Sequence, residues 1–157
     1  MPIMSSAERL FCQSPPWRWV AGRVILDWAL QGAAPRGAML ELGGGSGAMA
    51  AETIRRYPDC ELTVTDLDPA MVAATEQRFT DEPRVTVRQA DATALPFADG
   101  SFDVVVSFLM LHHVIEWRRA LDEVSRVLRP GGHFVGYDLV ASPLTKPRST
   151  DGPGRAR

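Results

Sequence analysis

Apolar residues in this chain fall into short continuous runs, and segments with helical periodicity separate most of these runs. Five segments have the length and composition of strands, at 39–42, 61–65, 85–88, 103–107 and 133–139, and of these 39–42 and 103–107 are apolar runs typical of buried strands. Three intervening segments repeat apolar residues at helical spacing, at 48–57, 69–79 and 116–128. Residues 93–102 contain Pro, Asp-Gly and Ser, so we predict a loop there. The alternation predicts an α/β domain whose parallel sheet carries helices on both faces.

The two ends of the chain differ from this pattern. Residues 17–30 predict a helix with three tryptophans, which either packs against the sheet edge or lines a pocket for a flat or apolar substrate. Residues 142–157 are rich in proline, glycine and basic residues and predict a solvated tail. We therefore expect an N-terminal segment with a helix (1–37), one folded domain (38–140) and a flexible tail (141–157).

Composition narrows the possible partners. The 17 basic and 19 acidic residues give a net charge of -2, so no global field draws the protein to nucleic acid or an anionic membrane. Cys12, Cys60 and only three histidines offer neither a disulfide framework nor a metal site. The sequence also contains no apolar run of membrane-spanning length and no signal-peptide pattern. We expect a cytoplasmic protein that binds a small molecule, with no metal, nucleic-acid or membrane partner.

A cluster of four glycines joins the first predicted strand to the helix that follows it: Gly43, Gly44, Gly45 and Gly47. Such a turn accepts positive φ angles and lets a ligand approach the backbone closely, although a flexible surface loop would have the same composition. The spacing satisfies both G-x-G-x-x-G/A, typical of nicotinamide and flavin dinucleotide sites, and G-x-G-x-G. The glycines alone therefore do not select the cofactor.

Acidic residues lie at the carboxyl ends of the first three predicted strands: Glu41, Asp66 and Asp91. Ligands of open α/β sheets bind at this edge, so the three acids are expected to form an arc around one crevice. Asp66 follows Gly47 by nineteen residues, the spacing of an acid that binds ribose hydroxyls. Asp66 is alternatively an ordinary turn residue, but Asp68 and Pro69 already supply the start of the next helix. We therefore favour ribose binding for Asp66.

Six segments, taken in order, resemble the class I S-adenosylmethionine-dependent methyltransferases. They look closest to the small-molecule branch that contains quinone-biosynthesis methyltransferases, and they span residues 38–139. The segments are ELGGGSG (41–47), VTDLDP (64–69), DATALPF (91–97), SFDVVV (101–106), LHHV (111–114) and RVLRPGG (126–132).

The resemblance implies S-adenosyl-L-methionine as cofactor and a role for each matching residue. The methionine part would meet three glycines of the turn: Gly43, Gly45 and Gly47. Glu41 would orient the cofactor amino group, directly or through water. Ser107 and Phe108 would border the reactive sulfonium.

For the nucleoside part, the resemblance implies that Asp66 binds the ribose hydroxyls and Leu67 flanks the adenine. Asp91 and Ala92 would receive the adenine amino edge. These residues follow the second and third predicted strands, so the nucleoside is expected to lie across those two strand ends.

His112 and His113 are the candidate catalytic bases for an acceptor that must lose a proton, because an imidazole titrates near neutral pH. The alternative is that these histidines cap or pack the start of the next helix. The sequence leaves both interpretations open.

The predicted function is methyl transfer from S-adenosylmethionine to a small-molecule acceptor. The alternatives are a truncated module that binds the cofactor without turnover and, less favoured, an NAD-dependent oxidoreductase. The resemblance implies a Rossmann-like doubly wound sheet in the order 3-2-1-4-5, lacking the family's usual C-terminal antiparallel hairpin. The fifth strand would then be an open edge. We expect a second subunit, giving a homodimer, or the N-terminal helix to cover it, unless the chain is a truncated or frameshifted product.

Overall fold

The computed structural model describes residue 30 and residues 35–138. The predicted tail and nearly all of the predicted tryptophan-containing helix lie outside the described residues. The described part contains a single sheet of five strands: β1 (Gly37–Leu42), β2 (Cys60–Asp66), β3 (Val85–Gln89), β4 (Phe102–Phe108) and β5 (Leu128–Tyr137).

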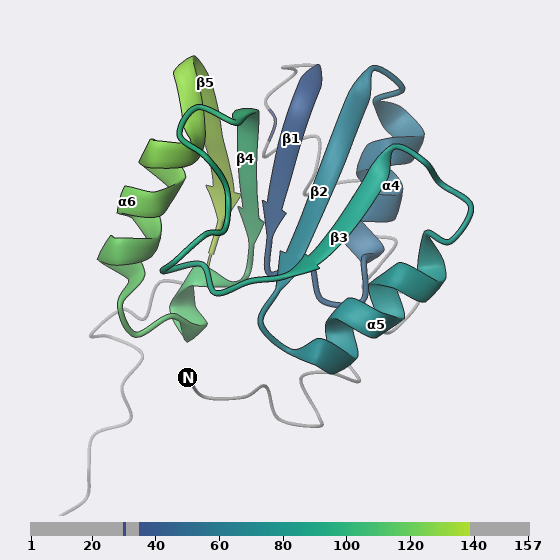
Figure 1. Cartoon of the computed structure of the whole chain (residues 1–157), viewed down its shortest axis with the longest axis horizontal. Coiled ribbons are helices and arrows are strands. Elements are labelled where there is room, and N and C mark those ends of the chain that lie inside the picture. Colours follow the sequence, from purple (N-terminus) through teal and green to yellow (C-terminus); the bar gives the residue numbers. More distant parts are fainter. Residues whose placement is uncertain (1–29, 31–34, 139–157) are drawn as a thin grey trace, which may run out of the picture.

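The strand order is β3-β2-β1-β4-β5 and every adjacent pair is parallel, which confirms the predicted fold class. The arrowheads in Figure 1 therefore point the same way. In the central register Leu42 pairs with Thr65 on one side and with Ser107 on the other. The carboxyl ends of β1, β2 and β4 consequently lie side by side and form the edge where such sheets bind ligands.

The predicted helices are present with slightly shorter bounds: α4 (Ala48–Arg56), α5 (Pro69–Arg78) and α6 (Trp117–Val127). A short 3₁₀ helix, η2 (Leu111–His113), precedes α6. As predicted, Asp68 and Pro69 start α5: Asp68 is the N-cap, and its carboxylate accepts the Ala70 N–H at 2.9 Å. Within the described residues, no helix combines the length and the apolar character needed to cross a bilayer.

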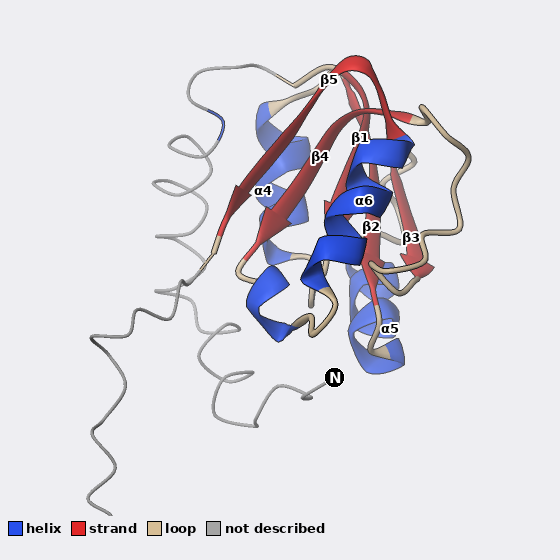
Figure 2. Cartoon of the chain, turned by 90° about the vertical axis from the view of Figure 1, so that its left-hand side faces the viewer, coloured by secondary structure: helices blue, strands red, loops and turns tan. Residues whose placement is uncertain are grey.

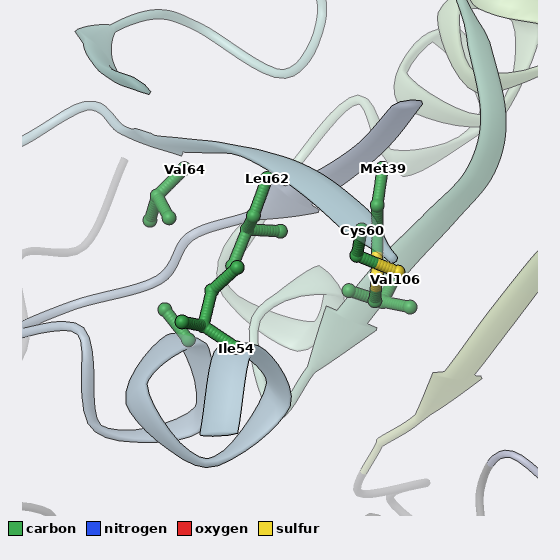
Figure 3. Packing of buried hydrophobic residues seen from close by; sticks show 7 residues of the cluster. Met39, Ile54, Cys60, Leu62, Val64 and Val106 are labelled. Carbon is green, nitrogen blue, oxygen red and sulfur yellow. The ribbon is translucent and has the colours of Figure 1, made fainter. Parts of the chain in front are cut away.

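The central strands of the sheet are buried on both faces, with α4 covering one face and α6 the other (Figure 2). Alternate residues of β1 enter different cores: Met39 packs with α4, whereas Leu40 packs with α6. Figure 3 shows part of the first core, where Ile54 of α4 lies with Leu62 of β2. Each fully buried aliphatic side chain contributes about 1.5–3 kcal/mol. These two cores hold the strand ends of the candidate site in fixed positions.

The predicted start of the fifth strand at His133 is wrong. The structure starts β5 at Leu128, directly after α6, because Leu128 pairs with Phe102 of β4. The register then shifts, so that Val104 pairs with His133 and the intervening residues bulge out of the ladder. Gly131 within this bulge has a φ of 82°. The Arg-Pro-Gly-Gly segment therefore follows the end of α6 but belongs to an irregular part of the strand rather than to a separate turn.

Candidate functional site

The glycine turn after β1 has the backbone conformation that its composition predicts. Gly43, Gly45 and Gly47 have φ angles of 65°, 55° and 73°. A Cβ atom added at Gly45 would meet no atom within 4 Å, whereas one at Gly43 would lie 2.2 Å from Cγ of Met110. Gly45 therefore exposes backbone to open space that a ligand can fill, and Gly43 is needed for packing against Met110.

Helix α5 and strand β2 hold this turn in place. The Thr75 hydroxyl donates to the Gly45 carbonyl at 2.7 Å, and Nε of Arg78 donates to the Ser46 carbonyl at 2.7 Å. From β2, the Thr65 carbonyl accepts the Gly44 N–H at 3.0 Å. The turn is thus an ordered element and not a flexible surface loop. The sequence analysis missed Thr75 and Arg78. Their spacing of three residues places both on one face of the helix, but the spacing does not show that this face contacts the glycine turn.

Asp66 is joined directly to the glycine turn. Its Oδ2 accepts the Gly45 N–H at 2.9 Å and its Oδ1 accepts the Asp68 N–H at 2.9 Å. Asp66 therefore is a turn residue and also lies at the predicted site. Each carboxylate oxygen has a second lone pair, so Asp66 retains the capacity to accept hydrogen bonds from a diol.

Glu41 is a buried carboxyl beside the same turn. The residue is 2 % exposed, and its Oε2 has no hydrogen-bond partner in the described part of the chain. A Cβ atom placed on Gly44 would lie 3.5 Å from Oε1, so the carboxyl lies against the turn. Burial, with a smaller effect of the nearby Asp66 charge, raises the pKa of Glu41 from 4.5 to about 8. A buried acid that lacks a partner fits a ligand carrying a cationic amino group.

The carboxyl end of β4 contains a second orphaned polar atom. Ser107 is buried and its hydroxyl has no partner among the described residues, while the adjacent Phe108 is partly exposed. Ser107 lies opposite Leu42, the last residue of β1. Ser107 and Phe108, which are predicted to border the reactive end of the ligand, therefore lie next to β1, the strand that leads into the glycine turn.

The residues predicted to bind the nucleoside lie in two connected loops. The Asp66 carbonyl accepts the Ala90 N–H at 3.0 Å, which ties the loop after β3 to the end of β2. Leu67 is 40 % exposed, so its side chain is available to cover a planar ring. Oδ1 of Asp91 accepts both the N–H and the hydroxyl of Thr93 at 2.8 Å, and this shapes the loop that contains the buried Ala92.

The histidines lie in η2, beyond the end of β4. Nδ1 of His112 contacts Oδ1 of Asp138, and the His112 backbone N–H donates to Oδ2 of Asp138 at 3.1 Å. The His113 ring lies 3.9 Å from the His112 ring, centroid to centroid. Asp138 follows β5, so the rule that acids at strand ends face one crevice applies to it too, although the sequence analysis did not pair it with a histidine.

No set of three or more possible metal ligands comes together in the described ranges, 30 and 35–138. The parallel sheet, the ordered glycine turn and an acid at the end of β2 are typical of α/β proteins that bind nucleotide-like cofactors at the carboxyl edge of the sheet. Residues 40–136 match the methyltransferase domain family, so the chain belongs to that family.

Two curated relatives are similar over most of this chain. The ubiquinone/menaquinone biosynthesis C-methyltransferase UbiE of Dinoroseobacter shibae is 40% identical over 122 residues, covering 76% of this chain and 48% of that protein. The demethylmenaquinone methyltransferase of Thermus thermophilus is 34% identical over 144 residues, covering 90% of this chain and 63% of that protein. The chain thus spans about half to two thirds of the length of these relatives.

Solved structures give the same fold. The [4+2]-cyclase SpnF has a TM-score of 0.70 and 27% identity, covering 76% of this chain and 45% of that chain. The PH0226 protein of Pyrococcus horikoshii has a TM-score of 0.75 and 23% identity, covering 85% of this chain and 66% of that chain. The presence of a cyclase among these structures shows that the fold alone does not determine the reaction.

Glu41 yields a prediction about stability and pH. Because its pKa is about 8 in the folded state, the folded protein keeps a proton between about pH 4.5 and 8 that the unfolded chain releases. This contribution is fully present below pH 4.5 and is lost as the pH rises towards 8. Glu41→Gln should therefore gain stability relative to wild type by about 1 kcal/mol per pH unit across this window, measured by urea unfolding.

Glu61→Gln is the matched control, because Glu61 is exposed on the neighbouring strand β2. Its stability should follow that of wild type at every pH. Parallel curves for wild type and Glu41→Gln would show that the Glu41 carboxyl titrates in the folded protein as it does in water.

Proposed function

We propose that this protein binds S-adenosyl-L-methionine and transfers its methyl group to a small-molecule acceptor. The observation that carries the proposal is the arrangement at the glycine turn. Gly45 is open to a ligand, and Asp66 is joined to that glycine. The Glu41 carboxyl lies against the turn, and its Oε2 has no partner among the described residues. Membership of the methyltransferase domain family and the names of the relatives support the same function.

Different residues around the turn would bind different parts of the cofactor. Glu41 would bind its amino group, and the open backbone at Gly45 would admit the methionine part, with Gly43 and Gly47 shaping the turn. Ser107 and Phe108 would border the reactive end. When bound, the cofactor supplies a methyl group already activated on a sulfonium, so the protein's main task is to hold the acceptor in line and exclude water.

The nucleoside would lie across the loops after β2 and β3. Asp66 would accept the ribose hydroxyls through its remaining lone pairs, Leu67 would cover one face of the adenine, and Asp91 with Ala92 would meet the amino edge. The hydrogen bond from Ala90 to the Asp66 carbonyl supports this division, because it fixes the spacing of the two loops.

Charge at the turn disfavours the oxidoreductase alternative. A dinucleotide would bring a pyrophosphate anion to the glycine turn, against which the buried Glu41 carboxyl already lies. An anion there would force the Glu41 carboxyl to remain protonated. A cationic amino group has the opposite effect, because it stabilises the ionised form of the orphaned Glu41 carboxyl.

Asp66→Ala should weaken binding of S-adenosylhomocysteine more than tenfold, which corresponds to over ~1.4 kcal/mol. The reason is the loss of both the proposed ribose contact and the hydrogen bond that orders Gly45. Isothermal titration calorimetry measures the affinity, with NADH titrated in parallel. Asp68→Ala is the matched control, because Asp68 caps α5 from two residues away and should change stability without changing affinity. An unchanged affinity in Asp66→Ala would remove Asp66 from the ribose role.

A turnover assay separates an enzyme from a module that only binds cofactor. The names of the relatives point to ring-bearing acceptors of the quinone type, so the panel comprises phenols, quinols and amines. We expect S-adenosylhomocysteine to be released with at least one quinol or phenol. Binding of the cofactor without any release would favour the module that binds without turnover. Binding of NADH in place of both sulfur ligands would favour the oxidoreductase.

We further propose that the edge of β5 forms a homodimer in a reducing, cytoplasmic setting. Among the described strands β5 pairs only with β4, and Phe134 on it is 37 % exposed. A small-molecule acceptor, rather than nucleic acid or a membrane, is consistent with the net charge of -2. Light scattering should give a dimer mass, and amides at 133–137 should exchange slowly. A monomer with rapid exchange there would contradict the proposal.

A further inference from the structure

The connection between β3 and β4 contains two of the residues predicted to meet the adenine, Asp91 and Ala92. It runs over residues 90–101 and contains no helix, although connections between parallel strands usually do. In Figure 1 it leaves β3 at the arrowhead and passes the ends of β2 and β1 towards α6. The backbone polar groups of such a loop need partners from other parts of the chain. Helix α6 supplies several of them.

Two charged side chains of α6 bind the backbone of Leu95 in this loop. Oε2 of Glu123 accepts the Leu95 N–H at 2.7 Å, and Nη2 of Arg126 donates to the Leu95 carbonyl at 3.0 Å. The Leu95 side chain is buried in the core that also contains Val124 and Val127 of α6. Leu95 is therefore held to α6 by its side chain and by both of its backbone polar groups.

Arg126 holds the rest of the loop as well. Its Nη1 donates to the Phe97 carbonyl at 2.7 Å and to Oδ1 of Asp99 at 2.8 Å, while its own carbonyl accepts the Gly100 N–H at 3.0 Å. Its guanidinium also donates to both carboxylate oxygens of Glu123 at 2.8 Å. These bonds lower the pKa of Glu123 below its ordinary value, so the pair is ionised near neutral pH and its hydrogen bonds are charge-assisted.

The same face of α6 contacts a predicted adenine-binding residue directly. Ala120, Glu123 and Arg126 are three residues apart and therefore lie on one side of the helix. Ala120 is fully buried and packs with Ala92 in a small apolar cluster. The helix thus contacts the loop at Ala92 and holds it again from Leu95 onwards.

A tight turn joins Asp91 to Leu95. The Asp91 carbonyl accepts the N–H of Ala94, the residue directly before Leu95, at 3.0 Å. Oδ1 of Asp91 accepts both the N–H and the hydroxyl of Thr93 at 2.8 Å. Oδ2 keeps its capacity to accept a hydrogen bond from an amino group. Because the turn is ordered internally, its position over the sheet depends on where Leu95 is held.

We propose that Arg126 and Glu123 are positioning residues for the nucleoside, and that by holding Leu95 they set the preference of the site for adenine. The inference rests on the proposed function and deepens it. The effect of the pair passes through Leu95 to Asp91 and Ala92. A loop held in one position presents a carboxylate to the adenine amino group, whereas hypoxanthine would bring a carbonyl oxygen to the same place. A site built to accept a hydrogen bond rejects such an analogue strongly, and a loosened loop does so less.

Amide hydrogen exchange of the unliganded protein tests how the loop is held. The Leu95 amide donates to Glu123, so it should exchange slowly in wild type and at least about tenfold faster in Arg126→Gln. The Leu62 amide of β2, which donates to the Arg84 carbonyl, is the internal reference for unfolding of the whole sheet. An unchanged ratio of the Leu95 and Leu62 exchange rates would overturn the proposal.

The choice of nucleobase tests the effect on binding. Isothermal titration calorimetry compares S-adenosylhomocysteine with S-inosylhomocysteine, which contains hypoxanthine. Wild type should bind the adenine ligand at least about tenfold more tightly. Arg126→Gln should reduce this ratio at least about fivefold, and Arg126→Lys, which keeps the charge without the guanidinium fork, should give an intermediate ratio. Loss of stability alone does not change the ratio, because both ligands bind the same folded protein.

Arg84→Gln is the matched control. Arg84 also donates to two backbone carbonyls, those of Ile54 and Pro58 at 3.3 Å, and it also pairs with a nearby carboxylate, that of Glu82. It directly precedes β3 and therefore lies at the opposite end of the sheet from Asp91. Arg84→Gln should lower stability and leave the ratio of the two affinities unchanged.

The outcomes separate the inference from the function on which it rests. A wild-type ratio near one, a wild-type ratio retained in Arg126→Gln, or an equal fall in Arg84→Gln would each overturn the proposal. The second of these results would mean that the contacts of α6 only stabilise the fold. Failure of wild type to bind S-adenosylhomocysteine at all would instead overturn the proposed function.

Discussion

The site depends on the hydrogen bonds of one carboxylate, that of Asp66. This side chain at the end of β2 accepts the Gly45 N–H and thereby joins the second strand to the turn that follows the first. The parallel register makes the contact possible, because it places the ends of β1 and β2 side by side. Thr75 and Arg78 secure the same turn from α5. Since the turn is held before any ligand arrives, binding requires little further ordering of the backbone.

Most of the sheet was predictable because its physical causes are local in the sequence. A run such as 103–107 is apolar on both faces, and Asp68-Pro69 marks the start of α5 unambiguously. The start of β5 was not predictable in this way. Leu128 is a strand residue only because Phe102 lies opposite it, and the glycines of the intervening bulge look like a turn when only the sequence is considered.

The candidate site likewise contains features that are local in the sequence and features that depend on long-range contacts. Glycine spacing and the distance to Asp66 are local signals, and the structure brings Gly45 and Asp66 together. The contacts of Thr75 and Asp138 span thirty and twenty-six residues, and each depends on where two elements meet in space. A single sequence does not show which distant elements come into contact. Residue types at strand ends can therefore be predicted from sequence, whereas the pairs that they form require the structure.

The packing of Met110 on Gly43 connects the glycine turn after β1 to the turn after β4. A side chain at position 43 would displace Met110, and through it the turn that begins at the left-handed Leu109. That turn is constrained from the other side by Tyr137 and Asp138. It cannot relax without losing hydrogen bonds to β5, so strain at Leu109 is retained. The same constraints that make this conformation persist also hold the His112 ring against Asp138.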